Sequence, residues 1–166
     1  KGEAAIHGPR WSYTLELMRK ISHIVIHCSA TIEGRDHDIK EVGKWHKARG
    51  FDRVGYHYLV KLNGEVQVGR PEGAIGAHVK GYNAVSIGVC YVGGLGLDAK
   101  PKDTRTDKQK ASMLKLLKEL KGRYPKAVIL GHRDLSPDLN KNGKVEPNEW
   151  MKACPSFHAE TEYARL

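Results

Sequence analysis

Two short apolar segments of this sequence each lead into a histidine, and they constrain the fold more than any other feature. Ile21–Cys28 is rich in β-branched residues and ends at a Ser-Ala-Thr turn, which predicts a buried strand. Lys126–Gly131 predicts a shorter strand that ends immediately before His132. Neighbouring strands of a sheet can end at the same edge. We therefore expect His27 and His132 to lie together although they are far apart in the sequence.

Helices and strands alternate along the rest of the chain, with one hairpin among them. A helix capped by Asp38 ends near Arg49, and its apolar face contains Ile39, Val42 and Trp45. A longer helix over Thr106–Tyr124 has an apolar stripe of Met113, Leu114, Leu117 and Leu120. The other expected elements are a hairpin over Tyr56–Leu62 and Glu65–Gly69, a strand over Ser86–Val92 and a last helix over His158–Arg165. This order predicts an α/β fold in which a mixed central sheet is flanked by helices.

The three cysteines are irregularly spaced, which argues against a disulfide framework. Cys28 and Cys90 lie in apolar strand-like segments, where a buried free thiol is expected. Cys154 differs because it precedes a proline in a polar, irregular stretch. Two imidazoles and one thiolate suit a tetrahedral zinc ion, and three protein ligands leave its fourth position open. An open position is typical of a hydrolytic site, so we predict one catalytic zinc held by His27, His132 and Cys154.

Length and charge narrow the remaining classes of protein. The 166 residues suit one domain, expected over residues 18–166, after an extension over residues 1–17 that could be left over from cloning. The net charge is +9, but the charges are dispersed and no nucleic-acid module is recognisable, so we expect no nucleic-acid partner. No apolar stretch has the length of a membrane span, and no signal peptide is visible. We expect a monomer that does not insert into membranes.

Six motifs in order resemble one known family. They are His27–Thr31, Val54–Tyr58, Gly76–Asn83, Ser86–Cys90, Gly131-His132 and Lys152–Phe157. These segments resemble the zinc-dependent N-acetylmuramoyl-L-alanine amidases, in particular the phage-lysozyme-type branch, which is related to the peptidoglycan recognition proteins. Six matches in order are much more specific than any single one.

The resemblance implies a mixed sheet with a groove for peptidoglycan, and cleavage of the amide between N-acetylmuramic acid and L-alanine. Carried over position by position, it implies His27, His132 and Cys154 as zinc ligands, with Tyr56 and Lys152 as catalytic helpers. Lys152 can present its ammonium group to the oxyanion that forms during hydrolysis, although a solvated surface lysine is the alternative. The hydroxyl of Tyr56 can orient a water or pass a proton to the departing amine, although a core tyrosine is the alternative.

His78 and Asn83 lie in a glycine-rich loop that resembles the wall of the family's substrate groove. Binding of the glycan or the stem peptide is one interpretation of these two residues. Stabilisation of a turn by their polar side chains is the other.

The spacing between His132 and Cys154 departs from the family, because a loop over residues 136–150 is inserted there. Residues 138–149 match the calcium-loop pattern D-x-[DN]-x-[DN]-G-x5-E in full. The expected ligands are the side chains of Asp138, Asn140, Asn142 and Glu149 and the backbone carbonyl of Lys144. Two asparagines lower the charge, no strong helix precedes Asp138, and Asn-Gly is also a common metal-free turn. If calcium binds, we expect a structural ion that makes the loop carrying Lys152 and Cys154 more rigid.

The leading hypothesis is therefore a zinc amidase that degrades or remodels cell-wall peptidoglycan in the periplasm or cell envelope. The alternative is a peptidoglycan-binding recognition module without activity. In the family such modules tend to lack the cysteine ligand, which this chain keeps as Cys154. A third hypothesis, a basic nucleic-acid-binding protein, would require strongly salt-dependent affinity for DNA or RNA.

Overall fold

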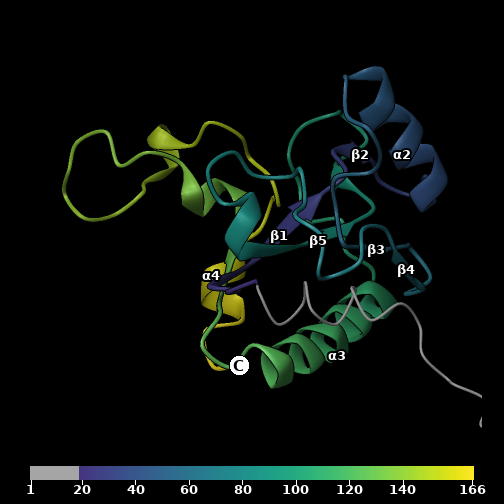
Figure 1. Ribbon diagram of the computed structural model, residues 1–166. Helices are drawn as coiled ribbons and strands as arrows, with labels where there is room; N and C mark the ends of the chain where they lie inside the picture. Colours follow the sequence, from purple (N-terminus) through teal and green to yellow (C-terminus); the bar gives the residue numbers. More distant parts are fainter. Residues whose placement is uncertain (1–18) are drawn as a thin grey trace, which may run out of the picture.

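The computed structural model describes residues 19–166, and the extension predicted over residues 1–17 lies outside them. A five-stranded sheet forms the centre of the fold, in the order β4-β3-β5-β1-β7. Its strands are β1 (His23–Cys28), β3 (Tyr58–Val60), β4 (Val66–Val68), β5 (Ser86–Tyr91) and β7 (Val128–Gly131). All neighbours pair in parallel except β3 and β4, which form the predicted antiparallel hairpin. The prediction of a mixed central sheet flanked by helices is confirmed (Figure 1).

Strand β1 lies between β5 and β7, and this position explains its composition. Residues 24–28 are all buried, as expected for a parallel strand covered on both faces. In the register of the sheet, Ile26 faces Val89 of β5 and Gly131 of β7. The next residue after each member of the Ile26–Gly131 pair is a histidine, His27 or His132. The parallel pairing of β1 and β7 therefore places these two histidines at the same edge, as predicted.

Helix α3 (Asp107–Arg123) covers one face of the sheet (Figure 1). Thr106 caps it through a reciprocal pair of hydrogen bonds with Gln109, which is a capping box. The residues packed on the sheet are Met113, Leu116, Leu117 and Leu120. Leu114, which was predicted in the buried stripe, is 39% exposed, and Leu116 takes its place. The short helix α4 (Ala159–Glu162) contributes Ala159 to the same core and is shorter than predicted.

Helix α2 (Ile39–Ala48) lies on the opposite face of the sheet from α3 (Figure 1). The backbone N–H of Glu41 donates to Asp38 at 2.8 Å, which confirms the predicted cap. Val42 and His46 are buried, whereas Trp45 is 37% exposed, so the prediction of Trp45 on the buried face is wrong. His46 replaces it because its Nδ1 accepts the N–H of Gly55, at 2.8 Å, within the fold.

Short elements complete the structure. Strands β2 (Thr31–Ile32) and β6 (Gly94–Leu95) pair as a separate small sheet, which the sequence pattern did not predict. Single 3-10 turns occur at η1 (Asn83–Val85), η2 (His132–Leu135) and η3 (Pro147–Glu149). None of the helices in residues 19–166 is long and apolar enough to cross a membrane.

Candidate metal centre

Three potential metal ligands from distant parts of the chain converge at the edge of the sheet. One nitrogen each of His27 and His132 and the sulfur of Cys154 all lie within 4.8 Å of one another. The Nδ1 atom of His27 lies 3.8 Å from the Cys154 sulfur, and the His27 and His132 ring centroids are 4.8 Å apart. His27 lies near the end of β1, His132 begins η2 directly after β7, and Cys154 lies on a loop. The structure thus brings together the three residues that the sequence predicted as zinc ligands.

Backbone contacts hold the loop of Cys154 against the end of β7. The N–H of Arg133 donates to the carbonyl oxygen of Cys154 at 2.9 Å. Gly131 allows this close approach, because a Cβ atom there would lie 2.6 Å from the Cδ of Pro155. The N–H of Gly131 in turn donates to the carboxylate of Asp134 at 2.7 Å. These contacts fix the third candidate ligand relative to the second, although the chain between them forms the long inserted loop.

His78 contacts the ring nitrogen of His27 that does not face Cys154. The Nε2 of His27 lies 2.8 Å from the Nδ1 of His78, and the Nε2 of His78 lies 3.2 Å from the hydroxyl of Ser86. Burial lowers the pKa of His78 to about 3 and lowers that of His27 well below its ordinary value, so both rings are neutral near pH 7. If Nδ1 of His27 is the ligand atom, its Nε2–H donates to His78, and the Nε2–H of His78 donates to Ser86. A second partner of this kind fixes the tautomer and orientation of a metal-binding histidine.

This arrangement bears on the two residues predicted to contact substrate. Both ring nitrogens of His78 are engaged within the protein, which favours a supporting role over a direct substrate contact. The side-chain oxygen of Asn83 accepts the N–H groups of His78 and Val79, each at 2.9 Å. Of the two interpretations that the sequence left open for Asn83, this bonding matches stabilisation of the turn. Substrate binding by either residue stays a prediction.

Tyr56 lies beside the three candidate ligands. Its ring centroid is 5.0 Å from that of His27, and the two ring planes are tilted by 48°. Burial, followed by the neighbouring Cys90, raises the pKa of Tyr56 well above its ordinary value. Its phenol therefore keeps its proton at neutral pH and can donate a hydrogen bond.

Lys152 is exposed and lies on the loop that carries Cys154. Burial lowers the pKa of His132 to about 4, and the positive charge of Lys152 lowers it further in the same direction. The same charge contributes to the low pKa of His27. The ammonium group is thus close enough for its field to act on the cluster, as its predicted role requires.

Cys28 is a neighbour of the cluster that the sequence analysis assigned only to the core. Its side chain is buried with the α3 face, as predicted, but its backbone N–H donates to the Cys154 sulfur at 3.2 Å. The neighbouring Cys28 thiol and then burial raise the pKa of Cys154 in the metal-free protein, whereas this N–H bond lowers it. The adjacency of Cys28 to His27 was the only signal in the sequence, and it did not reveal the contact.

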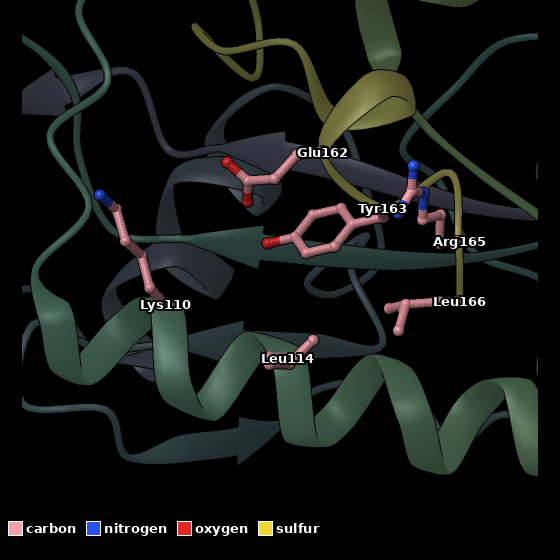
Figure 2. Close-up of a pocket in the computed structure, with 6 residues that line it drawn as sticks. All are labelled: Lys110, Leu114, Glu162, Tyr163, Arg165 and Leu166. Atoms are coloured by element: carbon pink, nitrogen blue, oxygen red, sulfur yellow. The ribbon is translucent and has the colours of Figure 1, made fainter.

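The predicted calcium loop and a surface pocket both lie away from the three candidate zinc ligands. The segment proposed to bind calcium, residues 138–149, belongs to the loop that follows η2, extends away from the sheet and includes η3 (Figure 1). A pocket lies between α3 and the C-terminal segment, lined by Lys110, Leu114, Glu162, Tyr163, Arg165 and Leu166 (Figure 2). None of the residues predicted to act in catalysis or binding lines this pocket.

Two imidazoles at the ends of neighbouring parallel strands, joined by a thiol from a loop, form a donor set typical of hydrolytic metalloenzymes. Comparison with known families identifies the family to which this chain belongs. Residues 17–156 match the family model described as N-acetylmuramoyl-L-alanine amidase, so the chain belongs to that family and is an amidase.

Individual relatives agree with this assignment. The chain is 41% identical over 139 residues to the endolysin of Enterobacteria phage K11, covering 84% of this chain and 83% of the relative. The Ph2119 endolysin from a Thermus scotoductus bacteriophage is a solved structure with a TM-score of 0.63 and 27% identity, covering 82% of this chain and 77% of that one. A complex of tracheal cytotoxin with peptidoglycan recognition proteins LCa and LCx matches with a TM-score of 0.64 and 27% identity, covering 90% and 84%.

Proposed function

We propose that this amidase hydrolyses the bond between N-acetylmuramic acid and L-alanine in peptidoglycan, and that it depends on one zinc ion held by His27, His132 and Cys154. The observation that carries the proposal is the convergence of these three ligand atoms within 4.8 Å. Two nitrogens and one sulfur are the donor set that zinc prefers. The contact between His27 and His78 supports the same assignment, because a metal-binding histidine usually donates its second N–H to an acceptor, and the Nδ1 of His78 can serve as one.

When bound in such a site, zinc supplies a water of lowered pKa and polarises the carbonyl of the scissile amide. The residues of the chain do the remaining work. The protonated phenol of Tyr56 orients the attacking water or donates a proton toward the departing amine. The ammonium group of Lys152 stabilises the negative charge that develops on the carbonyl oxygen. His78 and Ser86 hold the ring of His27 in place.

The test is digestion of defined muropeptides, with products identified by mass spectrometry and zinc measured in the same preparation. We expect intact sugar, free peptides that begin with L-alanine, and one zinc per chain. A Cys154→Ala variant is expected to lose both the metal and the activity. Full turnover by this variant, or a folded wild-type protein that binds no zinc, contradicts the proposal.

The same experiment separates the enzyme from a non-catalytic recognition module. Such a module would retain the muropeptide on the protein and release no peptide. The structural match to recognition proteins bound to tracheal cytotoxin makes this control informative. Peptidoglycan as the substrate also implies action in the cell envelope, and we expect the enzyme to act there as a monomer of 18.5 kDa. Gel filtration at a larger apparent mass would contradict the monomer.

A further inference from the structure

The loop inserted between the second and third candidate zinc ligands contains polar groups that the amidase site does not use. Its residues 138–149 carry Asp, Asn, Asn, Gly and Glu at positions 1, 3, 5, 6 and 12 of a twelve-residue loop. This is the order in which EF-hand loops place their oxygen ligands and their sharp turn.

The side-chain oxygens are turned inward by the backbone of the loop itself. Asp138 accepts the N–H of Gly143 at 2.8 Å, and Asn142 accepts that of Lys144 at 2.9 Å. Asn140 accepts the N–H of Asn142 at 3.0 Å. The side-chain oxygens at positions 1, 3 and 5 are thus gathered by one tight turn.

The last residue of the pattern folds back over the first part of the loop. The Glu149 carboxylate accepts the N–H of Asn140 at 3.1 Å and that of Glu146 at 2.8 Å, and the residue is only 5% exposed. The amide of Asn140 donates to the Glu146 carboxylate at 3.0 Å, which draws a third acidic side chain to the same place. Three carboxylates and two amide oxygens are therefore contributed by one twelve-residue loop, and hydrogen bonds within the loop hold all five side chains.

One oxygen of this loop lacks a partner, an observation that does not depend on the sequence pattern. The Oδ1 atom of Asp138 is shielded from solvent and has no hydrogen-bond partner among residues 19–166. A buried carboxylate oxygen without a partner is unfavourable, and native proteins rarely leave one so. A cation bound to this oxygen removes the cost, whereas the hydrogen bonds within the loop leave it unpaired.

We propose that residues 138–149 bind one calcium ion through Asp138, Asn140, Asn142, Glu149 and the carbonyl of Lys144. All of these donors are oxygens, which favours a hard cation over zinc. The loop pattern has the length and ligand number of calcium sites rather than the octahedral geometry that magnesium requires. Because asparagine replaces aspartate at two positions, we expect weak binding, with a Kd on the order of 10⁻⁴ to 10⁻³ M.

The ion acts on the segment that carries the zinc ligand, a consequence that rests on the proposed function. The N–H of Met151 donates to Ser136 at 3.2 Å, which joins the two ends of the inserted loop. The guanidinium group of Arg133 lies 3.8 Å from the centre of the Trp150 ring, and the Arg133 N–H holds Cys154. Ordering of Glu149 by calcium therefore reduces the freedom of the residues that lead to Lys152 and Cys154.

The test is a titration of CaCl2 into zinc-loaded protein that has been desalted into calcium-free buffer. At about ten times the Kd, we expect the Tm to rise by roughly 3–6 °C. Terbium is a second probe, because the indole of Trp150 follows the loop directly and can sensitise its emission. No thermal shift and no sensitised terbium emission at millimolar concentrations would overturn the proposal.

Variants locate the ion. Asp138→Asn is expected to weaken calcium binding at least tenfold, and Asn142→Ala, at an exposed position, is expected to weaken it without disturbing the core. Glu160→Gln is the control, because it removes a negative charge from an exposed residue outside the loop. Unchanged binding in both loop variants would overturn the proposal, as would equal weakening in the control.

Calcium binding is measured here without any activity assay, so its failure is distinguishable from failure of the amidase proposal. The Cys154→Ala variant, which lacks a zinc ligand, is expected to keep its calcium-dependent Tm shift. Loss of that shift in Cys154→Ala would contradict an independent calcium site.

Discussion

Replacement of His78 by alanine tests whether this residue positions His27 for the metal. In the structure, Nε2 of the buried His27 has the His78 nitrogen at 2.8 Å as its hydrogen-bond partner. Without metal, the His27 ring can shift its proton or rotate once that partner is gone. With Nδ1 on the metal, the ring must keep its Nε2–H buried and unpaired. A buried, unpaired N–H group destabilises the protein by about 1–3 kcal/mol. The zinc-bound protein is destabilised by this full amount, whereas the metal-free protein can avoid part of it.

The expected loss of zinc affinity follows from this difference. A penalty of about 1.4 to 2.8 kcal/mol corresponds to about a 10–100-fold weaker Kd, the range typical of such supporting residues. Competition against a chromophoric zinc chelator measures the affinity directly, without an activity assay. His37→Ala is a matched control, because the His37 ring bonds Glu41 at the surface of α2.

A second variant separates the hydrogen bond from simple packing. Asn has an oxygen close to the place of the histidine Nδ1, so His78→Asn should restore most of the zinc affinity. A His78→Ala protein that is folded and binds zinc as tightly as wild type would refute the reasoning. Equal loss in His78→Asn and His78→Ala would assign the effect to packing instead.

Three further predictions address other parts of the site. Lys152→Ala should lower kcat by about a hundredfold or more while zinc content stays at one per chain, and unchanged turnover would remove Lys152 from catalysis. Gly88→Ala should weaken zinc binding as His78→Ala does, because its Cβ would lie 2.8–2.9 Å from three ring atoms of His78. Gly122→Ala, where nothing lies within 4 Å of the added Cβ, should leave zinc affinity unchanged. The third prediction concerns pH: burial lowers the pKa of His57 to about 4, from 6.5 in the unfolded chain. The unfolded state therefore binds more protons below pH 6.5, and stability is lost as the pH falls toward 4. Urea unfolding should show that wild type loses about 3 kcal/mol more than His57→Gln between pH 7 and pH 4, and equal losses would contradict the assignment.

The strand ends that carry the two histidines were predictable because parallel pairing fixes where such ends lie. The register of β1 and β7 then required His27 and His132 to follow neighbouring positions. The cap at Asp38 was predictable because it depends on residues within one turn, whereas Thr106, predicted as the first residue of its helix, is that helix's N-cap. The ends of strands and the caps of helices follow from short sequence patterns, so they can be predicted from the sequence.

Features that depend on how distant segments meet were not predictable in the same way. The rotation of α3 on the sheet buries Leu116 rather than Leu114, although both fit an apolar stripe. The contact between His78 and His27 requires the loop before β5 to pass behind β1, which no spacing in the sequence encodes. The stacking of Arg133 on Trp150 across the inserted loop is of the same kind.

The three candidate ligands differ in how strongly the fold constrains their positions. His27 lies near the end of the interior strand β1 and His132 follows the edge strand β7, so a change in the spacing of these two donors would disturb the core. The sulfur donor instead follows a closed insertion whose ends are joined by the bond between Met151 and Ser136. Evolution or an engineer can therefore lengthen, shorten or exchange that insertion, and with it retune ion dependence and access to the reacting bond, while the imidazoles keep their places.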